Sequence, residues 1–342
     1  MMFVLPIQRM SELFAAIHAK NTLYLPTDDG CGQSDFHIWQ EGSVLSNRCN
    51  TANSIKDFFF PQTENLVDFK VSGKKIEIFD PRKECEDFVL FGVRACDLRS
   101  LDILDRVFLS EPVDTYYQNR RAHATIVTLA CTRPQETCFC TTFEIDPADP
   151  KGDVSSWIVG EELFLRANTA KGEALLQSVS ELLQPSDDCL VKEQQAQIRR
   201  TLEKLPLAAL DLTTFKQSDL LSLFESEKWQ QLAEYCLGCG CCTFVCPTCQ
   251  CYDIRDFDNG HGVNRYRCWD SCMYSDFTRM AHGNPRLTQT ERFRQRFMHK
   301  LVYYPSKNEG IFGCVGCGRC IAKCPISMNI AKVIKALGET NA

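Results

Sequence analysis

The 342-residue chain lacks long apolar runs, an excess of positive charge and the common catalytic motifs. No stretch approaches the roughly 18 apolar residues that a membrane-spanning helix needs, and residues 1–10 lack the pattern of a signal peptide. The net charge of −6 argues against a nucleic-acid or membrane-surface binder, because both need a positive field. We therefore expect a cytoplasmic protein that binds neither nucleic acid nor membrane.

Motifs for nucleotide binding and hydrolysis are missing as well. No Gly-x-Gly-x-x-Gly segment follows an expected strand, and neither a Walker motif nor a Ser/His/Asp pattern occurs. The sequence thus gives no reason to name a catalytic residue. What it does contain is 21 cysteines. Because cytoplasmic thiols are kept reduced, clustered cysteines there indicate metal binding or redox chemistry sooner than disulfides.

Two cysteine runs share one spacing, Cys-x2-Cys-x2-Cys-x3-Cys-Pro. They comprise Cys236, Cys239, Cys242 and Cys246 before Pro247, and Cys314, Cys317, Cys320 and Cys324 before Pro325. Four thiolates at this spacing bind a cubane 4Fe-4S cluster. Structural zinc sites usually combine two separated cysteine pairs, so the spacing favours iron and sulfide. The runs predict a protein that transfers electrons.

The fourth cysteine of each run is expected to cross to the other cluster, as in two-cluster ferredoxins. One predicted cluster then has the ligands Cys236, Cys239, Cys242 and Cys324, and the other has Cys314, Cys317, Cys320 and Cys246. Glycines at 238, 240, 316 and 318 favour positive-φ turns that bring backbone N–H groups close to sulfur.

The pattern of apolar residues predicts an α+β chain in three parts. Residues 1–190 are expected to form a mixed α/β domain, 191–231 a helical connector, and 232–342 a ferredoxin-like domain with a long insertion at 248–313. Expected strands cover 76–79, 88–93, 125–129, 157–159 and 163–165, and expected helices cover 94–108, 172–183 and 289–304.

A second candidate metal site lies in the first domain. Cys96 follows one expected strand and Cys131 follows the next, with Cys138 and Cys140 shortly after. Because the ends of parallel strands meet at one sheet edge, these four thiols are predicted to converge and to hold a third cluster or, less favoured, zinc. The plain alternative is that they pack as small apolar side chains. Isolated cysteines are interpreted as structural: Cys31, Cys49, Cys85 and Cys189.

The insertion holds a further thiol group and many arginines. Cys249, Cys251, Cys268 and Cys272 form either another metal site or a reduced core. The arginines, Arg292 and Arg296 among them, either form a solvated face or offset the negative charge of clusters and dock an acidic partner.

The order of these features resembles a known family, the iron-sulfur β subunit of cytoplasmic sulfhydrogenase-type nickel-iron hydrogenases, which is similar to an iron-sulfur subunit of anaerobic sulfite reductases. The resemblance is carried by Phe91–Asp105, Cys131–Cys140, Cys246–Tyr252, Trp269–Cys272 and Cys314–Cys320. Cys241 and Cys268 depart from the pattern of that family, which counts against Cys268 as a ligand.

The resemblance implies an electron-transfer subunit that lies between a flavin subunit handling NAD(P)H, or a ferredoxin, and a separate catalytic subunit. We therefore predict two 4Fe-4S clusters, a third in the first domain, and a hetero-oligomer. Two rivals stay open. One is a redox enzyme with its own centre anchored by Cys249, Cys251 and Cys272, and the other is a zinc-stabilised interaction module.

Overall fold

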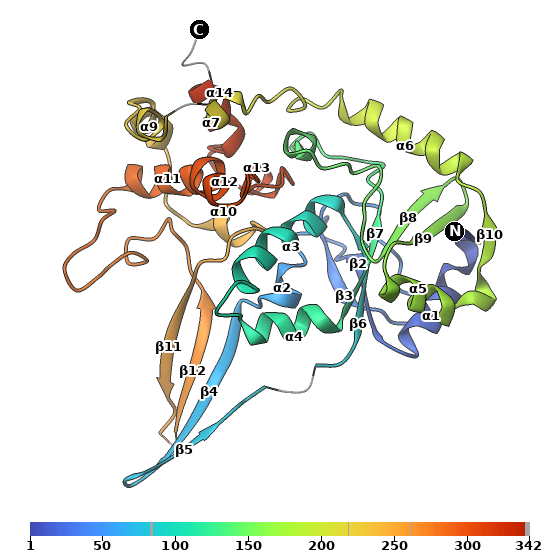
Figure 1. Ribbon diagram of the computed structural model, residues 1–342, viewed down its shortest axis with the longest axis horizontal. Helices are drawn as coiled ribbons and strands as arrows, with labels where there is room; N and C mark the ends of the chain where they lie inside the picture. Colours follow the sequence, from blue (N-terminus) through green and yellow to red (C-terminus); the bar gives the residue numbers. More distant parts are fainter. Residues whose placement is uncertain (83–84, 218, 261, 339–342) are drawn as a thin grey trace. The chain divides into compact units, whose positions relative to one another are not determined.

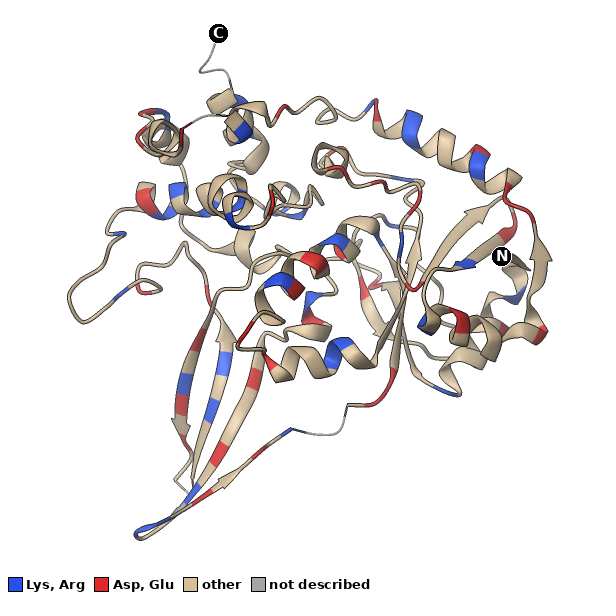
Figure 2. Ribbon diagram, viewed as in Figure 1, with Lys and Arg blue, Asp and Glu red and all other residues tan. Residues whose placement is uncertain are grey.

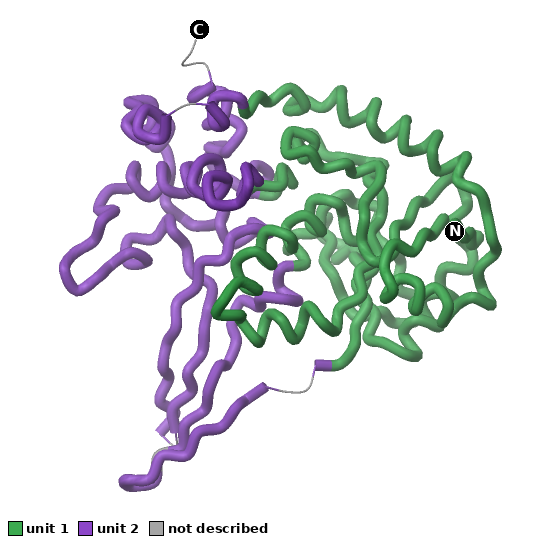
Figure 3. Tube along the Cα trace, viewed as in Figure 1, with its two compact units in different colours: residues 1–55, 86–212, 314–319 green, residues 56–85, 213–313, 320–342 purple. Residues whose placement is uncertain are grey.

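The computed structural model describes residues 1–82, 85–217, 219–260 and 262–338, and it divides into two units (Figure 3). Unit 1 comprises residues 1–55, 86–212 and 314–319, and unit 2 comprises 56–85, 213–313 and 320–342. Neither unit is one continuous stretch of chain. The units thus differ from the linear domains expected at 1–190, 191–231 and 232–342.

Unit 1 is built on an eight-stranded sheet (Figure 1) with the order β10-β1-β9-β8-β7-β6-β2-β3. Its strands are β1 (Met2–Pro6), β2 (Thr22–Asp28), β3 (Ser34–Ile38), β6 (Phe88–Val93), β7 (Ala124–Leu129), β8 (Val154–Val159), β9 (Glu162–Ala167) and β10 (Gln184–Ser186). Neighbours β2, β6, β7 and β8 are parallel, and the other pairs are antiparallel. The buried strands predicted at 88–93 and 125–129 and the hairpin at 157–165 are confirmed.

The helices of unit 1 are α1 (Met10–His18), α3 (Ala95–Phe108), α4 (Thr115–His123), α5 (Ala170–Ser178) and α6 (Cys189–Leu202). Two apolar clusters join α1, α5 and α6 to the sheet. One cluster joins α1 and α5 to the sheet through residues such as Phe14, Leu175 and Phe91. The other joins Ile198 and Leu202 of α6 to Trp157. The predicted break at residue 190 therefore falls inside unit 1, because the apolar side of α6 is part of its core.

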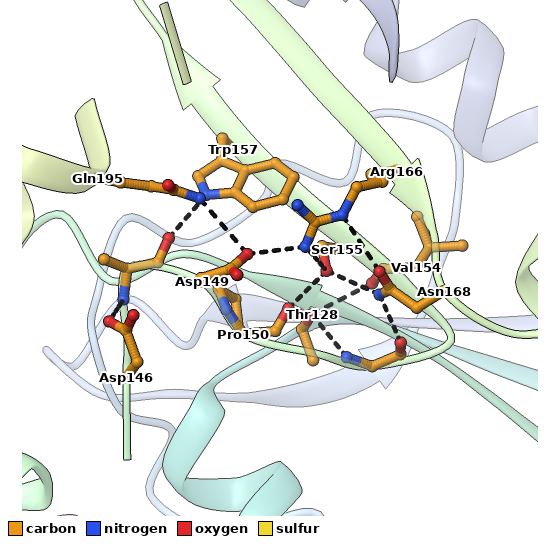
Figure 4. Close-up of polar contacts among 12 residues, drawn as sticks. Thr128, Asp146, Asp149, Pro150, Val154, Ser155, Trp157, Arg166, Asn168 and Gln195 are labelled. Carbon is orange, nitrogen blue, oxygen red and sulfur yellow. Dashed lines mark hydrogen bonds and ion pairs between the residues drawn. The ribbon is translucent and has the colours of Figure 1, made fainter. Parts of the chain in front are cut away.

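A polar network fastens residues 146–153 to the sheet (Figure 4). The indole Nε1 of Trp157 donates to the carbonyl of Ala148 at 2.8 Å, and Arg166 donates to the Asp149 carboxylate at 2.7 Å. Ser155 Oγ donates to the carbonyl of Pro150 at 2.6 Å. Buried polar groups that are satisfied in this way hold one conformation. The loop that follows Cys138 and Cys140 is thereby anchored.

Unit 2 contains a four-stranded antiparallel sheet with the order β11-β12-β4-β5. The strands are β4 (Thr63–Ser72), β5 (Lys75–Phe79), β11 (Tyr252–Asp258) and β12 (Val263–Trp269). Charged residues of both signs lie along β11 and arginines along β12 (Figure 2), and Arg265 and Asp256 pair across the two strands at 2.7 Å. The segment 56–85 supplies two of these strands although it lies far from the others in sequence.

The remaining elements of unit 2 are helical. They are α2 (Lys56–Phe59), α7 (Thr213–Gln217), α8 (Leu220–Phe224), α9 (Lys228–Ala233), α10 (Cys241–Phe244), α11 (Gln289–Met298), a π-helical turn η4 (His299–Tyr303), α12 (Tyr304–Lys307) and α14 (Ile330–Gly338); α13 (Arg319–Ala322) begins at the last residue of unit 1. The helix predicted at 289–304 is confirmed as α11 and η4, and its apolar side places Phe293 against Trp229 of α9. Among the described residues, no helix combines the length and apolar character needed to cross a bilayer.

Candidate iron-sulfur sites

The first candidate site is a cavity within unit 2 that is lined by cysteines of both runs. Cys236, Cys239 and Cys242 come from the first run and Cys324 from the second, and Arg296 and Phe293 of α11 complete the wall. The fold thus brings together the four side chains of the first predicted ligand set. Soft thiolates in this number are the donors that a 4Fe-4S cluster takes.

Local backbone geometry explains how the first run curls around this cavity. Gly240 has φ +73°, and a Cβ there would lie 2.6 Å from the Tyr274 hydroxyl. Tyr274 in turn donates to the carbonyl of Cys239 at 3.3 Å, and Gln289 Nε2 donates to the sulfur of Cys236 at 3.5 Å. The positive φ predicted at glycines 238, 240, 316 and 318 is confirmed at all four.

Arg296 gives the cavity a buried positive charge. Its side chain is 3% exposed, and its Nε has no hydrogen-bond partner among the described residues. Burial lowers the pKa of Arg296, but neighbouring cysteine thiols, Cys242 and Cys320 foremost, outweigh burial and hold this pKa above its ordinary value. A buried cation without such a counter-charge is costly, so the site suits an anionic group. For Arg296, the expectation of a solvated face is wrong.

The second predicted ligand set is divided between the units. Cys314 and Cys317 belong to unit 1, whereas Cys320 and Cys246 belong to unit 2. Within unit 1, the N–H of Gly316 points to the sulfur of Cys314 at 3.5 Å, and Asn50 Nδ2 donates to the carbonyl of Cys317 at 2.7 Å. The assignment of this set to one cluster continues to rest on the spacing of the sequence.

A third group of thiols lies in the core of unit 1. Cys49, Cys131 and Cys138 form a buried cluster with exposures of 8%, 6% and 4%. The sulfurs of Cys49 and Cys131 are 3.3 Å apart, and Asn50 Nδ2 lies 3.9 Å from the sulfur of Cys138. Hydrogen bonds with Cys131 and Cys138 hold the pKa of Cys49 well below its ordinary value. Cys49 is therefore the thiol of this group that ionises most readily.

Cys96 and Cys140 lie next to this group. Both are buried, at 7% exposure each. Burial, helped by Cys49, raises the pKa of Cys140 to about 12, and Cys96 is a neighbour of Cys140, Cys138 and Cys317. The four cysteines predicted to converge at the carboxyl edge of the sheet thus lie in one region of unit 1.

Sequence reasoning missed Cys49, which it had interpreted as a structural cysteine. Cys49 precedes Cys131 by 82 residues, and no paired spacing marks it. Its loop is held by Arg94, whose guanidinium donates to the carbonyls of Cys49 at 3.0 Å and Ala130 at 2.8 Å. The position of Cys49 beside Cys131 follows only from this contact between distant segments. The sequence therefore contained no pattern that marked Cys49 as a member of the thiol group.

The remaining thiols fall into two classes. Cys249, Cys251 and Cys272 lie near one another in unit 2, whereas Cys268 sits within the ladder of β12 opposite Asp253. Among the described residues, no three His, Cys, Asp or Glu side chains already stand at the spacing of ligands to one metal ion. The same holds for the thiols of the ferredoxin runs.

The comparisons with known proteins identify the family of the chain and the kind of domain at its cysteine runs. Residues 235–328 match the family of the 4Fe-4S dicluster domain, which confirms the prediction of two 4Fe-4S clusters in this part of the chain. No solved structure matches the chain. A 289-residue alignment gives 37% identity to "Sulfhydrogenase 2 subunit beta" of Pyrococcus furiosus and covers 83% of this chain and 82% of the relative. The chain therefore belongs to the sulfhydrogenase β-subunit family, as an electron-transfer protein with a 4Fe-4S dicluster domain.

Proposed function

We propose that the protein relays single electrons between a flavin subunit that handles NAD(P)H, or a ferredoxin, and a separate catalytic subunit of the hydrogenase or sulfite reductase type. The name of the Pyrococcus relative describes a subunit, which supports a hetero-oligomer. A cytoplasmic location is part of the proposal, because thiols are kept reduced there and stay available to bind clusters. One-electron transfer is the chemistry that the bound clusters would supply.

The observation that carries this proposal is the shared cavity of the two cysteine runs. Cys324 of the second run lies with Cys236, Cys239 and Cys242 of the first, which is the crossing that a two-cluster ferredoxin uses. We assign the first cluster to these four cysteines and the second to Cys314, Cys317, Cys320 and Cys246. Side chains of this chain then tune the first site, because Gln289 donates to a ligand sulfur and Arg296 supplies positive charge.

A third cluster is part of the proposal and is assigned to unit 1. We assign three of its ligands to Cys131, Cys138 and Cys140. The fourth place was predicted for Cys96, and the contacts of Cys49 with both Cys131 and Cys138 make Cys49 its rival. Comparing Cys96→Ser with Cys49→Ser decides between them, since only the variant that removes a ligand loses this cluster.

Stepwise reduction tests the relay itself. We expect anaerobically purified protein to be reduced by NAD(P)H only when its flavin subunit is added, and to pass those electrons to the catalytic subunit. Turnover of a two-electron substrate by the isolated chain would favour the rival of a self-contained redox enzyme. Zinc at one or more atoms per chain without acid-labile sulfide would establish the interaction module instead.

A further inference from the structure

Three thiols of unit 2 stand outside both ferredoxin runs and next to each other. The thiols of Cys251 and Cys272 hydrogen-bond to one another, and the backbone N–H of Cys272 also donates to the sulfur of Cys251. Cys249 is a neighbour of both and hydrogen-bonds to Cys246. All three are half-buried free thiols. We call Cys249, Cys251 and Cys272 the hairpin trio.

The β11–β12 hairpin explains why these thiols meet. Tyr252 at the start of β11 pairs with Trp269 at the end of β12, so the chain enters and leaves the hairpin at the same end. The N–H of Asp270 donates to the carbonyl of Cys251 at 2.9 Å and continues the pairing by one step. Cys251 directly precedes the ladder and Cys272 follows it closely. Antiparallel pairing therefore fixes the two thiols side by side.

Hydroxyl groups fix the backbone on both sides of the trio. Ser271 is fully buried, and its Oγ lies 2.8 Å from Oγ1 of Thr243 and accepts from the N–H of Met273 at 3.1 Å. Thr248 Oγ1 donates to the carbonyl of Gly313 at 2.8 Å. Cys249 and Cys272 thus each follow a buried residue that is tied to another segment. These contacts fix the position of the backbone that carries Cys249 and Cys272.

Two buried ammonium groups lie beside the trio. Lys300 is 6% exposed, and its Nζ donates to Thr248 Oγ1 at 2.7 Å and to the carbonyl of Gly313 at 3.0 Å. Lys56 is 1% exposed, and its Nζ donates to the carbonyl of Cys249 at 3.2 Å and lies 3.3 Å from the centre of the Trp269 ring. Two buried positive charges therefore lie against Thr248 and Cys249.

Cys268, the fourth cysteine of the insertion, can be compared with the hairpin trio. It lies on the same hairpin, four residues before Cys272, but it is paired with Asp253 inside the ladder. Its charged neighbours are Arg255, Asp253 and Asp270, and none of them is a thiol. The fold therefore separates the trio from the fourth cysteine of the insertion.

We propose that Cys249, Cys251 and Cys272 hold an additional iron-sulfur cluster, separate from the two clusters of the ferredoxin runs. Three thiolates bind three irons of a cubane and leave the fourth iron to a ligand that is not one of these cysteines. Lys56 and Lys300 offset the negative charge that sulfide and thiolates bring into the site. The inference does not depend on the relay partners named above, since it concerns cluster content alone.

Metal content of matched variants tests the proposal. The full chain is purified anaerobically as wild type, as Cys251→Ser, as Cys272→Ser and as the control Cys268→Ser. Each trio variant is expected to lose about four irons and about four sulfides per chain, whereas the control retains the wild-type content. The electron paramagnetic resonance signals of the two ferredoxin clusters are expected to persist in every variant. Their presence shows that unit 2 is folded and keeps the test of the trio separate from the assignment of the two ferredoxin clusters.

Alkylation of the wild type provides a second measurement that needs no variant. In the cluster-loaded protein, the trio is expected to be protected from iodoacetamide while Cys268 reacts, and removal of iron by a chelator exposes the trio. Unchanged iron in both trio variants, equal loss in the Cys268→Ser control, zinc in place of iron and sulfide, or alkylation of the trio in the loaded protein would each overturn the proposal.

Discussion

The thiols of unit 1 and those of unit 2 are placed by different means. In unit 1, Cys49, Cys131 and Cys138 are buried, and Arg94 holds the loops of Cys49 and Cys131 through their backbone carbonyls. In unit 2, most cysteines are half-buried and lie on loops or short helices, and Arg296, Lys300 and Lys56 are buried in the same unit. A rigid sheet edge fixes the first group, and local loop geometry with buried positive charge fixes the second.

This difference leads to separate expectations about what each group tolerates. The unit 1 thiols depend on long-range packing, so changes in the anchoring contacts are expected to disturb folding. The unit 2 thiols lie near buried positive charge, so changes in that charge are expected to alter redox properties with less effect on the fold. Loss of a thiol or of a buried contact in unit 1 should therefore have a larger effect than a change of charge in unit 2.

The largest effect is expected from removing a thiol at the centre of the unit 1 group. Cys131→Ser and Cys138→Ser are each predicted to lose about four irons per chain, because a cubane needs its thiolate ligands. The matched control is Cys189→Ser, since Cys189 is an exposed cysteine of the same unit. Iron and sulfide analysis measures the difference. Full iron content in both variants would show that these thiols only pack.

Breaking the buried ion pair of unit 1 is expected to be the next largest effect. Arg319 donates to Asp97 at 2.7 Å, and both side chains are almost inaccessible, at 4% and 2%. Asp97→Asn strands the guanidinium and should lower the free energy of unfolding by ~3–5 kcal/mol. The control Asp102→Asn removes an exposed pair with Arg99 and should change little. Denaturation midpoints that coincide for the two variants would contradict this expectation.

Alanine substitutions at two glycines of unit 1 distinguish the cost of backbone strain from the cost of a steric clash. Gly160 and Gly316 both have φ +59°, but a Cβ at 316 would lie 2.5 Å from the Phe139 carbonyl, whereas at 160 nothing lies within 4 Å. Gly160→Ala should cost about 1 kcal/mol, which is the strain of the left-handed backbone alone. Gly316→Ala should cost ~2–4 kcal/mol because the clash is added. Thermal unfolding compares them, and equal shifts would mean that Phe139 moves aside freely.

Unit 2 should respond to charge more than to packing. Arg296→Gln removes the buried positive charge beside Cys242. That charge stabilises the reduced, more negative form of the first cluster. We expect its reduction potential to fall by roughly 50–100 mV, the effect of a unit charge about 8 Å away at a dielectric constant near 20. Exposed Arg255 offers the control Arg255→Gln. A potential that stays unchanged in Arg296→Gln would place the cluster away from this guanidinium.

Local patterns of the sequence predicted local structure well. Strands at 88–93 and 125–129, the hairpin around Gly160 and helix α11 follow from the alternation and spacing of apolar residues within each segment. The predicted helix at 172–183 forms as α5, which ends at Ser178 and is followed by a 3-10 turn. These elements depend on contacts between residues close in sequence. The periodicity of apolar residues within a segment reports on such contacts.

Long-range pairing accounts for what the sequence could not reveal. Strand β4 joins β12 across almost two hundred residues, and its segment of 56–85 belongs to unit 2 for that reason. Cys49 meets Cys131 through the loops at one sheet edge, and its isolated position gave no hint of this. By contrast, the cysteines around the first cavity were predictable, because three of the four lie within seven residues of each other.

The crossing of the fourth cysteines is the central claim, and one comparison of variants tests it most directly. Cys236→Ala, Cys314→Ala and Cys324→Ala are purified anaerobically, and the electron paramagnetic resonance signals of the reduced proteins are followed against potential. We predict that Cys324→Ala loses the same signal as Cys236→Ala and keeps the signal lost in Cys314→Ala. Loss of the same signal in Cys324→Ala and Cys314→Ala, with the Cys236 signal intact, would contradict the crossing.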